Sequence, residues 1–349
     1  MFNALDRAEH SHKRRVVGQL ITERSMRFFE PTMALQIDVF LRQLLTSSQK
    51  DEVVNTTTRC QRLAADVVGL LAFVYELNTQ TEDTNKIIPA AMKSASYRIS
   101  LYMAWPAISF VDPVVRWLGR KQLPKFHQAL KKMIGRRMGM PKDSGHDLYA
   151  VASGDVTVSG HKGLQGTNLW SEVSFFVMAG GMTVSTLMSA VFFYLSRHPD
   201  VYARLAAEVR TTFTSGGAIA SGQQLSSCRY LRGVIDETMR VAPQTTATPW
   251  REDDVYLAMP PRSHGPWVVD GHVIPRGVAV GVSPYSVLHN EAYFPEPFAF
   301  RPERWLDAGD DEDGGFDEEA QATMRRAFVP FALGDRACVA RPWLTSKRA

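Results

Sequence analysis

Apolar residues recur at intervals of three and four through most of the first 150 residues, which is the spacing of one face of an amphipathic helix. Two stripes of this kind contain Leu63, Val67, Leu70, Leu71 and Val74, and further along Phe126, Leu130, Met133 and Ile134. The pattern predicts a helical part over residues 1–150 whose stripes face a core.

A second feature is the stretch from Val173 to Ser196, which carries no charged residue. At about 1.5 Å per residue a helix of this length is long enough to cross a bilayer. Its glycine, serine and threonine residues suit close packing against protein better than contact with lipid tails. We therefore expect a long, buried central helix over 172–197, with a membrane-spanning helix as the alternative.

Strand signals appear only late in the chain. A helix expected over 226–240 is followed by a β-rich part over 248–283, in which Asp270-Gly271 marks a hairpin and Val278, Val280 and Val282 alternate. Helices first and short strands later predict a mainly α (α+β) fold with a small late β-sheet, in a single domain over 1–349.

Composition narrows the function classes. A formal net charge of +4 on 349 residues is too small and too dispersed to require nucleic acid as a partner. The three cysteines lie far apart in sequence, so neither a disulfide framework nor a Cys-x-x-Cys zinc site is expected. The first residues are charged and have no apolar stretch behind them, so no signal peptide or membrane anchor is expected there.

The segment Phe331-Ala-Leu-Gly-Asp-Arg-Ala-Cys338 carries the strongest chemical signal. Gly334 permits a turn with positive φ just before Cys338, and Arg336 is suited to bind an acid group. A single thiolate held in this way suits haem iron, although a lone cysteine is more often an apolar filler of a core. The pattern predicts a cysteine-ligand loop over 328–340.

This loop resembles the F-x-x-G-x-R-x-C-x-G motif of the cytochrome P450 family, with Ala340 in place of the last glycine. Three further motifs of that family lie upstream in the same order. They are E-x-x-R at Glu237-Thr-Met-Arg240, the P-E-R-F/W box in Phe300-Arg-Pro-Glu-Arg-Trp305, and the oxygen-helix signature at Ala179-Gly-Gly-Met-Thr-Val184. In detail the chain is similar to filamentous-fungal P450s that oxidise secondary metabolites.

The resemblance implies a haem whose iron takes Cys338 as its axial thiolate ligand. It implies that Arg336, Arg14, His10 and Arg251 bind the haem propionates. It also implies that Gly180, Gly181 and Phe331 lie against the macrocycle, since glycine without a side chain allows close approach.

The resemblance also assigns catalytic, structural and substrate-binding roles. Thr183 is the expected catalytic residue on the long helix, where Met182 replaces the family's acid and, as a thioether, cannot relay a proton. Glu237, Arg240 and Arg304 are expected to form a buried structural triad. An apolar substrate pocket is expected from Phe175, Phe176, Ala179, Thr245, Thr246 and Ala247.

These assignments predict a haem-thiolate monooxygenase that inserts one oxygen atom from O₂ into an apolar small molecule, with electrons from NADPH-cytochrome P450 reductase. The family works on the cytoplasmic side of the endoplasmic reticulum; without an anchor this chain is expected to be soluble and cytoplasmic, with membrane association only through absent segments. Compared with the family, the P450-like domain is expected to be incomplete at both ends, and Pro342 opposes a helix after Cys338. A truncated P450-derived protein with impaired or no turnover and a non-haem helical membrane protein remain as alternatives.

Overall fold

The computed structural model describes residues 4, 6–18, 23–118, 123–141, 147–153, 164, 166–252, 267–307 and 316–341. The N-terminal half is built from α1 (Arg7–Gly18), α2 (Glu23–Gln49), α3 (Thr56–Phe73), α4 (Ile87–Ala104), the short 3₁₀ helix η1 (Pro106–Val111), α5 (Asp112–Leu118), α6 (Leu123–Met138) and α7 (Leu148–Ser153). Residues 342–349, where Pro342 is expected to oppose a helix, lie outside the described residues.

The C-terminal half begins with the longest helix. Its elements are α8 (Gly166–Leu195), α9 (Pro199–Thr212), η2 (Gly216–Ala218), α10 (Gln223–Ser227), α11 (Arg229–Val241), β1 (Trp267–Val269), β2 (His272–Ile274), α12 (Pro284–Leu288), η3 (Pro302–Trp305), α13 (Glu318–Ala327) and η4 (Gly334–Arg336). The mainly helical fold with a small late sheet is therefore confirmed. The E-x-x-R helix begins at Arg229 and not at 226, because α10 occupies part of the expected span.

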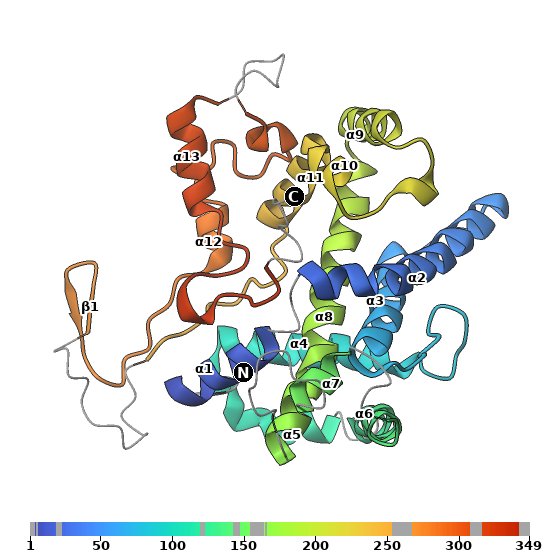
Figure 1. Ribbon diagram of the computed structural model, residues 1–349. Coiled ribbons are helices and arrows are strands. Elements are labelled where there is room, and N and C mark those ends of the chain that lie inside the picture. The colour runs from blue at the N-terminus through green and yellow to red at the C-terminus, as the bar shows by residue number, and fades with distance from the viewer. Residues whose placement is uncertain are drawn as a thin grey trace.

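Helix α8 runs through the middle of the molecule, with α3 packed along it (Figure 1). It starts at Gly166, earlier than the expected 172, and ends at Leu195. Its buried residues Val173, Phe176 and Val177 join the main core, to which α3, α4 and α6 also contribute.

Residues 169–195 also form a helix that is long and apolar enough, by length and composition alone, to cross a membrane. The helix packs against α3, α4, α7 and α11, but only 22% of its apolar window is buried within the described structure, less than expected for a buried central helix.

Two glycines of α8 allow this close packing. A Cβ on Gly180 would lie 2.9 Å from Val68 Cγ2 on α3, and one on Gly181 would lie 2.1 Å from Met92 Cε on α4. The missing side chains therefore make room for α3 and α4. The expected place of the two glycines against a macrocycle stays a prediction, to which these contacts add a packing reason for the missing side chains.

The late part of the chain contains one hairpin among the described residues, in which β1 pairs antiparallel with β2. Asp270 and Gly271 both have positive φ, 50° and 77°, as a two-residue type I′ turn requires. Within the described part of the chain, the expected alternation at 278–282 gives a single bridge, between Arg251 and Val280. Residues 253–266 of the expected β-rich part lie outside the described residues. In Figure 1 the hairpin stands apart from the helical body.

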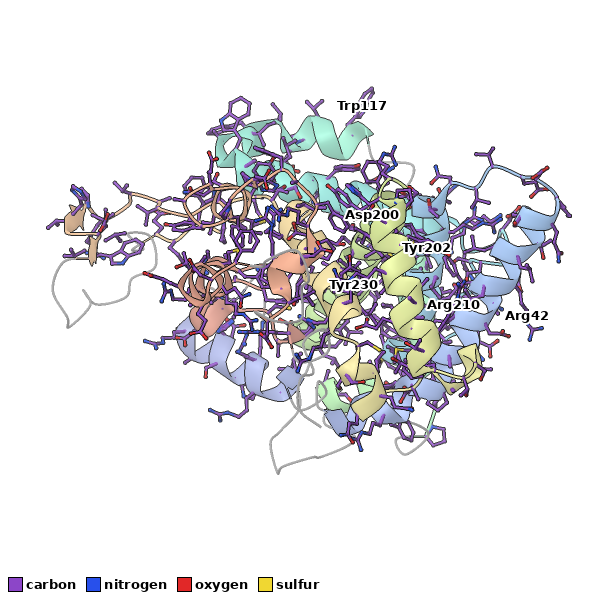
Figure 2. The ribbon with its side chains drawn as sticks, turned by 90° about the horizontal axis from the view of Figure 1, so that it is seen from above. Arg42, Trp117, Asp200, Tyr202, Arg210 and Tyr230 are labelled. Atoms are coloured by element: carbon purple, nitrogen blue, oxygen red, sulfur yellow. The ribbon has the colours of Figure 1, made fainter. Side chains whose placement is uncertain are left out.

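Helix α11 is fixed at its start by α9. The Glu208 carboxylate accepts hydrogen bonds from the backbone N–H groups of Tyr230 and Leu231, both at 2.8 Å. An acid at this position satisfies unpaired N–H groups and complements the positive end of the helix dipole. The Tyr230 side chain lies beside α9 (Figure 2). The guanidinium carbon of Arg204 lies over its ring, 4.4 Å from the ring centroid. These contacts set the direction of the helix that carries Glu237.

Candidate functional site

The cysteine loop has the turn that its sequence predicts. Gly334 has φ of 74°, a conformation that glycine adopts without strain. The backbone N–H of Cys338 donates to the carbonyl of Phe331 at 2.8 Å, which closes the loop. The Cys338 thiol is exposed, and Phe331 is half-buried. The loop therefore holds an accessible sulfur on a defined backbone.

Helix α1 packs its basic face against this loop. The Arg14 guanidinium donates through Nη1 to the carbonyl of Ala337, at 2.6 Å. Arg336 donates in turn to the carbonyl of Ala4, just before α1, at 2.6 Å. Segments more than 320 positions apart in sequence are thus joined directly beside Cys338.

Positive charge accumulates at this contact. Burial lowers the pKa of His10, and the charges of Arg336 and Arg14 lower it further, with Asp335 opposing them. Burial also lowers the pKa of Arg336, to which the charge of Arg251 adds. The charges of Arg14 and Arg336 therefore reach His10, and the charge of Arg251 reaches Arg336, as neighbouring like charges do. The structure places Arg14 and Arg336 at the contact between α1 and the cysteine loop, and the binding of acid groups by the four residues stays a prediction.

On α8 the Thr183 side chain is exposed, and its hydroxyl donates to the carbonyl of Ala179 at 2.7 Å. Ala179, one turn earlier, is half-buried. A threonine bonded to the carbonyl four residues back favours a local bend of the helix. Met182 instead packs partly buried against the main core, so its thioether does not replace the polar group that the motif has there.

The residues expected in the substrate pocket do not share one environment. Phe176 is 9% exposed and belongs to the core cluster together with Val173 and Val177, and its place in a substrate pocket stays a prediction. Phe175 and Ala179 are half-buried. In the turn after α11, Thr245 and Thr246 are exposed and Ala247 is buried.

Glu237, Arg240 and Arg304 form the expected buried network, with each residue no more than 1% exposed. Arg240 donates to both carboxylate oxygens of Glu237, at 2.8 and 2.9 Å, and Arg304 approaches the same carboxylate at 3.4 Å. Arg240 also donates to the backbone carbonyls of Leu288, Pro297 and Ala299. The triad therefore holds α11 against the chain segment that precedes η3.

One member of this network was not expected from the sequence. Trp305 donates its indole N–H to the second Glu237 oxygen at 3.0 Å. Its neighbour Arg304 donates to the carbonyl of Glu296 at 2.8 Å. The position tolerates phenylalanine or tryptophan in the P-E-R-F/W box, so the motif alone does not signal that the ring donates a hydrogen bond.

Comparison with known proteins decides the family. The model of the family described as Cytochrome P450 matches residues 1–342. The chain belongs to the cytochrome P450 family. The P450 monooxygenase lcsN of Purpureocillium lilacinum is 30% identical over 287 residues, which cover 80% of each chain. The P450 monooxygenase poxM of Penicillium oxalicum is 27% identical over 346 residues, 96% of this chain and 63% of the relative.

The fold agrees with this assignment. The crystal structure of a cytochrome P450DA heme domain superposes with a TM-score of 0.70 at 20% identity, over 96% of this chain and 67% of that one. The chain spans less than two thirds of the length of several curated P450 relatives, among them poxM and the P450 monooxygenase atnE of Emericella nidulans, at 63% and 65%.

P450 membership implies a haem with a thiolate-ligated iron as the cofactor, and the residues present fit this group. Cys60 and Cys228 are buried, and burial raises the pKa of the Cys60 thiol, which opposes its use as a thiolate. Cys338 is therefore the residue placed to supply the thiolate. The basic cluster beside it has the charge that two carboxylates require. Each residue's role toward the haem stays a prediction.

A pH dependence of stability follows from His10. Because its pKa is lower in the folded chain than the ordinary 6.5, the unfolded chain binds more protons between those two values. Without haem, the free energy of unfolding should therefore fall as the pH drops below 6.5. Urea titrations of wild type and His10→Gln between pH 7 and 5 measure this, and the glutamine variant should show the smaller loss.

Haem carboxylates near His10 should reverse this effect, because nearby negative charge raises the pKa of an imidazole. The difference between wild type and His10→Gln should then shrink in the haem-bound protein. Identical pH profiles of the two haem-free chains would contradict the assigned environment of His10.

Proposed function

We propose that this P450 chain is a haem-thiolate monooxygenase that oxidises an apolar small molecule in fungal secondary metabolism. The observation that carries the proposal is the accessible Cys338 thiol, held beside His10, Arg14, Arg251 and Arg336 on the loop that α1 contacts. In the overall reaction, O₂ gives one oxygen atom to a C–H bond of the substrate and the other to water. NADPH supplies the two electrons through a P450 reductase, and the solvent supplies the proton that the balance requires.

The haem, when bound, supplies the oxygen activation, and the protein orients it. Arg14, Arg336, Arg251 and His10 would hold its carboxylates, and Cys338 would supply the thiolate for its iron. Thr183 would hold a proton at its hydroxyl oxygen, which in the described structure is hydrogen-bonded to Ala179. Phe175 and Ala179 offer apolar surface to a substrate. This combination supports an apolar ligand without naming it.

A second candidate is a P450 that binds haem but turns over poorly. It is favoured by Met182, which packs against the apolar core where the motif has an acid. With no carboxylate at this position, a proton would have to reach Thr183 through water. Electrons delivered by the reductase would then be lost to peroxide more readily than to product. We place either form on the cytoplasmic side of the endoplasmic reticulum, where the reductase partner works.

The test is a spectrum of the reduced, CO-treated chain expressed with ample haem supply. A thiolate ligand gives a strongly red-shifted Soret band, so wild type should show this band and Cys338→Ser should lose it completely. Cys228→Ser is the matched control, because that thiol is buried elsewhere, and it should keep the band. A wild-type chain that stays colourless, or a band that survives in Cys338→Ser, would overturn the proposal.

Product formation with reductase and NADPH separates the two candidates. Product that scales with NADPH consumption supports the monooxygenase. A normal thiolate band with NADPH consumed and peroxide released supports the poorly coupled form.

A further inference from the structure

Helix α1 carries a buried cation that the cysteine site does not use. The Lys13 side chain is 8% exposed, and its Nζ lies 2.7 Å from Oε1 of Glu9, one turn earlier on the same helix. It also lies 3.5 Å from Oε1 of Glu172 on α8, and the Glu172 side chain is only 4% exposed. A buried charge that loses its partner is costly. The Lys13 ammonium is therefore held at these carboxylates.

The two carboxylates do different things. Glu9 belongs to α1 itself, so its pair with Lys13 moves with the helix and fixes nothing outside it. Glu172 belongs to α8, so its pair with Lys13 joins the helix that contacts the cysteine loop to the central helix of the fold.

This ion pair sets the rotation of α1 about its own axis. Successive residues of an α-helix are turned by about 100°, so fixing Lys13 also fixes the direction of Arg14 beside it and of His10 one turn before. Arg14 is directed at the carbonyl of Ala337, and His10, one turn before Lys13, is buried on α1. The buried residues Val16 and Val17 turn one face of α1 toward the core, and the ion pair adds a directional contact between α1 and α8.

We infer that Glu172 is a positioning residue for the carboxylate-binding end of the haem site, and that it acts through Lys13. Its carboxylate holds Lys13, Lys13 holds the rotation of α1, and α1 then presents Arg14 and His10 toward the Cys338 loop. This inference rests on the proposed haem site. It adds a residue 166 positions from Cys338 in sequence to the set that determines how a dicarboxylate porphyrin is bound.

The test compares two porphyrins that differ only at their acid groups, haem and haem dimethyl ester. Each is titrated into the haem-free full chain, and the dissociation constant is read from the Soret absorbance. The variants are Glu172→Gln, which keeps the size of the side chain and removes its charge, and Lys13→Met. Asp66→Asn is the matched control, because it also removes a buried carboxylate, one whose bonds go to Thr79 and Gln80.

Glu172→Gln should weaken the binding of haem by about tenfold, the equivalent of one charge-assisted hydrogen bond, and should change ester binding little. Lys13→Met should show the same selectivity, and the double variant should be no weaker than Lys13→Met alone, because both residues act as one unit. Asp66→Asn should show no selectivity between the two porphyrins.

Other outcomes separate the two ways of failing. Suppose that wild type binds haem more tightly than its ester. If Glu172→Gln then weakens the binding of both porphyrins equally, or of neither, the positioning role is wrong and the haem site stands. If wild type binds neither porphyrin, or prefers neither, the proposed haem site itself is wrong.

Discussion

Replacing Glu237 with alanine should lower the free energy of unfolding by about 3–5 kcal/mol, because it strands buried arginines. Arg240 and Arg304 are 0% and 1% exposed, and both direct their guanidinium groups at this carboxylate. Burial already lowers the pKa of Arg304, and the charge of Glu237 offsets that effect. Without the carboxylate, two positive charges would remain in a site closed to water, together with an indole N–H of Trp305 that has lost its acceptor.

Urea unfolding followed by circular dichroism measures this loss. Asp38→Ala is the matched control, since it also removes one acid from an ion pair, but the pair with Arg42 is exposed and should contribute about 1 kcal/mol or less. Glu237→Gln keeps the shape of the side chain and reports on the charge alone if the alanine variant does not fold. Losses of similar size in Glu237→Ala and Asp38→Ala would contradict the role assigned to the network.

The second large effect is expected at Asp147, which lies just before α7. Its Oδ2 accepts a hydrogen bond from Arg137 Nε at 2.7 Å, and both side chains are 1% exposed. Its Oδ1 accepts from the backbone N–H of Ala150 at 2.9 Å and so caps the helix. Asp147→Asn keeps an oxygen for the cap but removes the charge, and should cost about 3–5 kcal/mol because Arg137 is left buried without a counter-charge.

Removing the charges of both Arg137 and Asp147 should change the free energy of unfolding much less than removing that of Asp147 alone. Burial raises the pKa of Asp147, the hydrogen bond and charge of Arg137 oppose that shift, and replacing both members of a buried ion pair by uncharged side chains is often nearly neutral for stability. The combination of Arg137→Met with Asp147→Asn should therefore unfold at nearly the same urea concentration as wild type. A double variant as unstable as Asp147→Asn alone would mean that Arg137 contributes by packing, for example through its contact with Tyr149 at 5.6 Å.

Local features of this fold were predictable from sequence because they depend on neighbouring residues. The positive φ at Gly334, the turn at Asp270-Gly271 and the pairing of Glu237 with Arg240 one turn apart all follow from short-range geometry. The approach of α1 to the cysteine loop was predictable only through resemblance to the P450 family, since no local pattern joins positions 14 and 337.

Other features depend on which face of a helix packs against which neighbour. Helix α8 shows why sequence periodicity does not predict such packing. Both faces of α8 are apolar, so periodicity cannot separate Phe176, which lies in the core, from Phe175 beside it. For the same reason the sequence did not predict that α3 and α4 pack closely against Gly180 and Gly181. The link between Lys13 and Glu172 was equally invisible, because two charged residues 159 positions apart give no sequence signal.

The Glu237 network also has a kinetic consequence. Its partners Leu288, Pro297, Ala299 and Trp305 lie between 48 and 68 positions along the chain from the residues they bind. Closing loops of this length costs entropy before any bond is gained, which slows the formation of such contacts. We therefore expect the network to form after the local contacts of α11, and a nascent chain carries Arg240 without these partners until residues 288–305 have been synthesised.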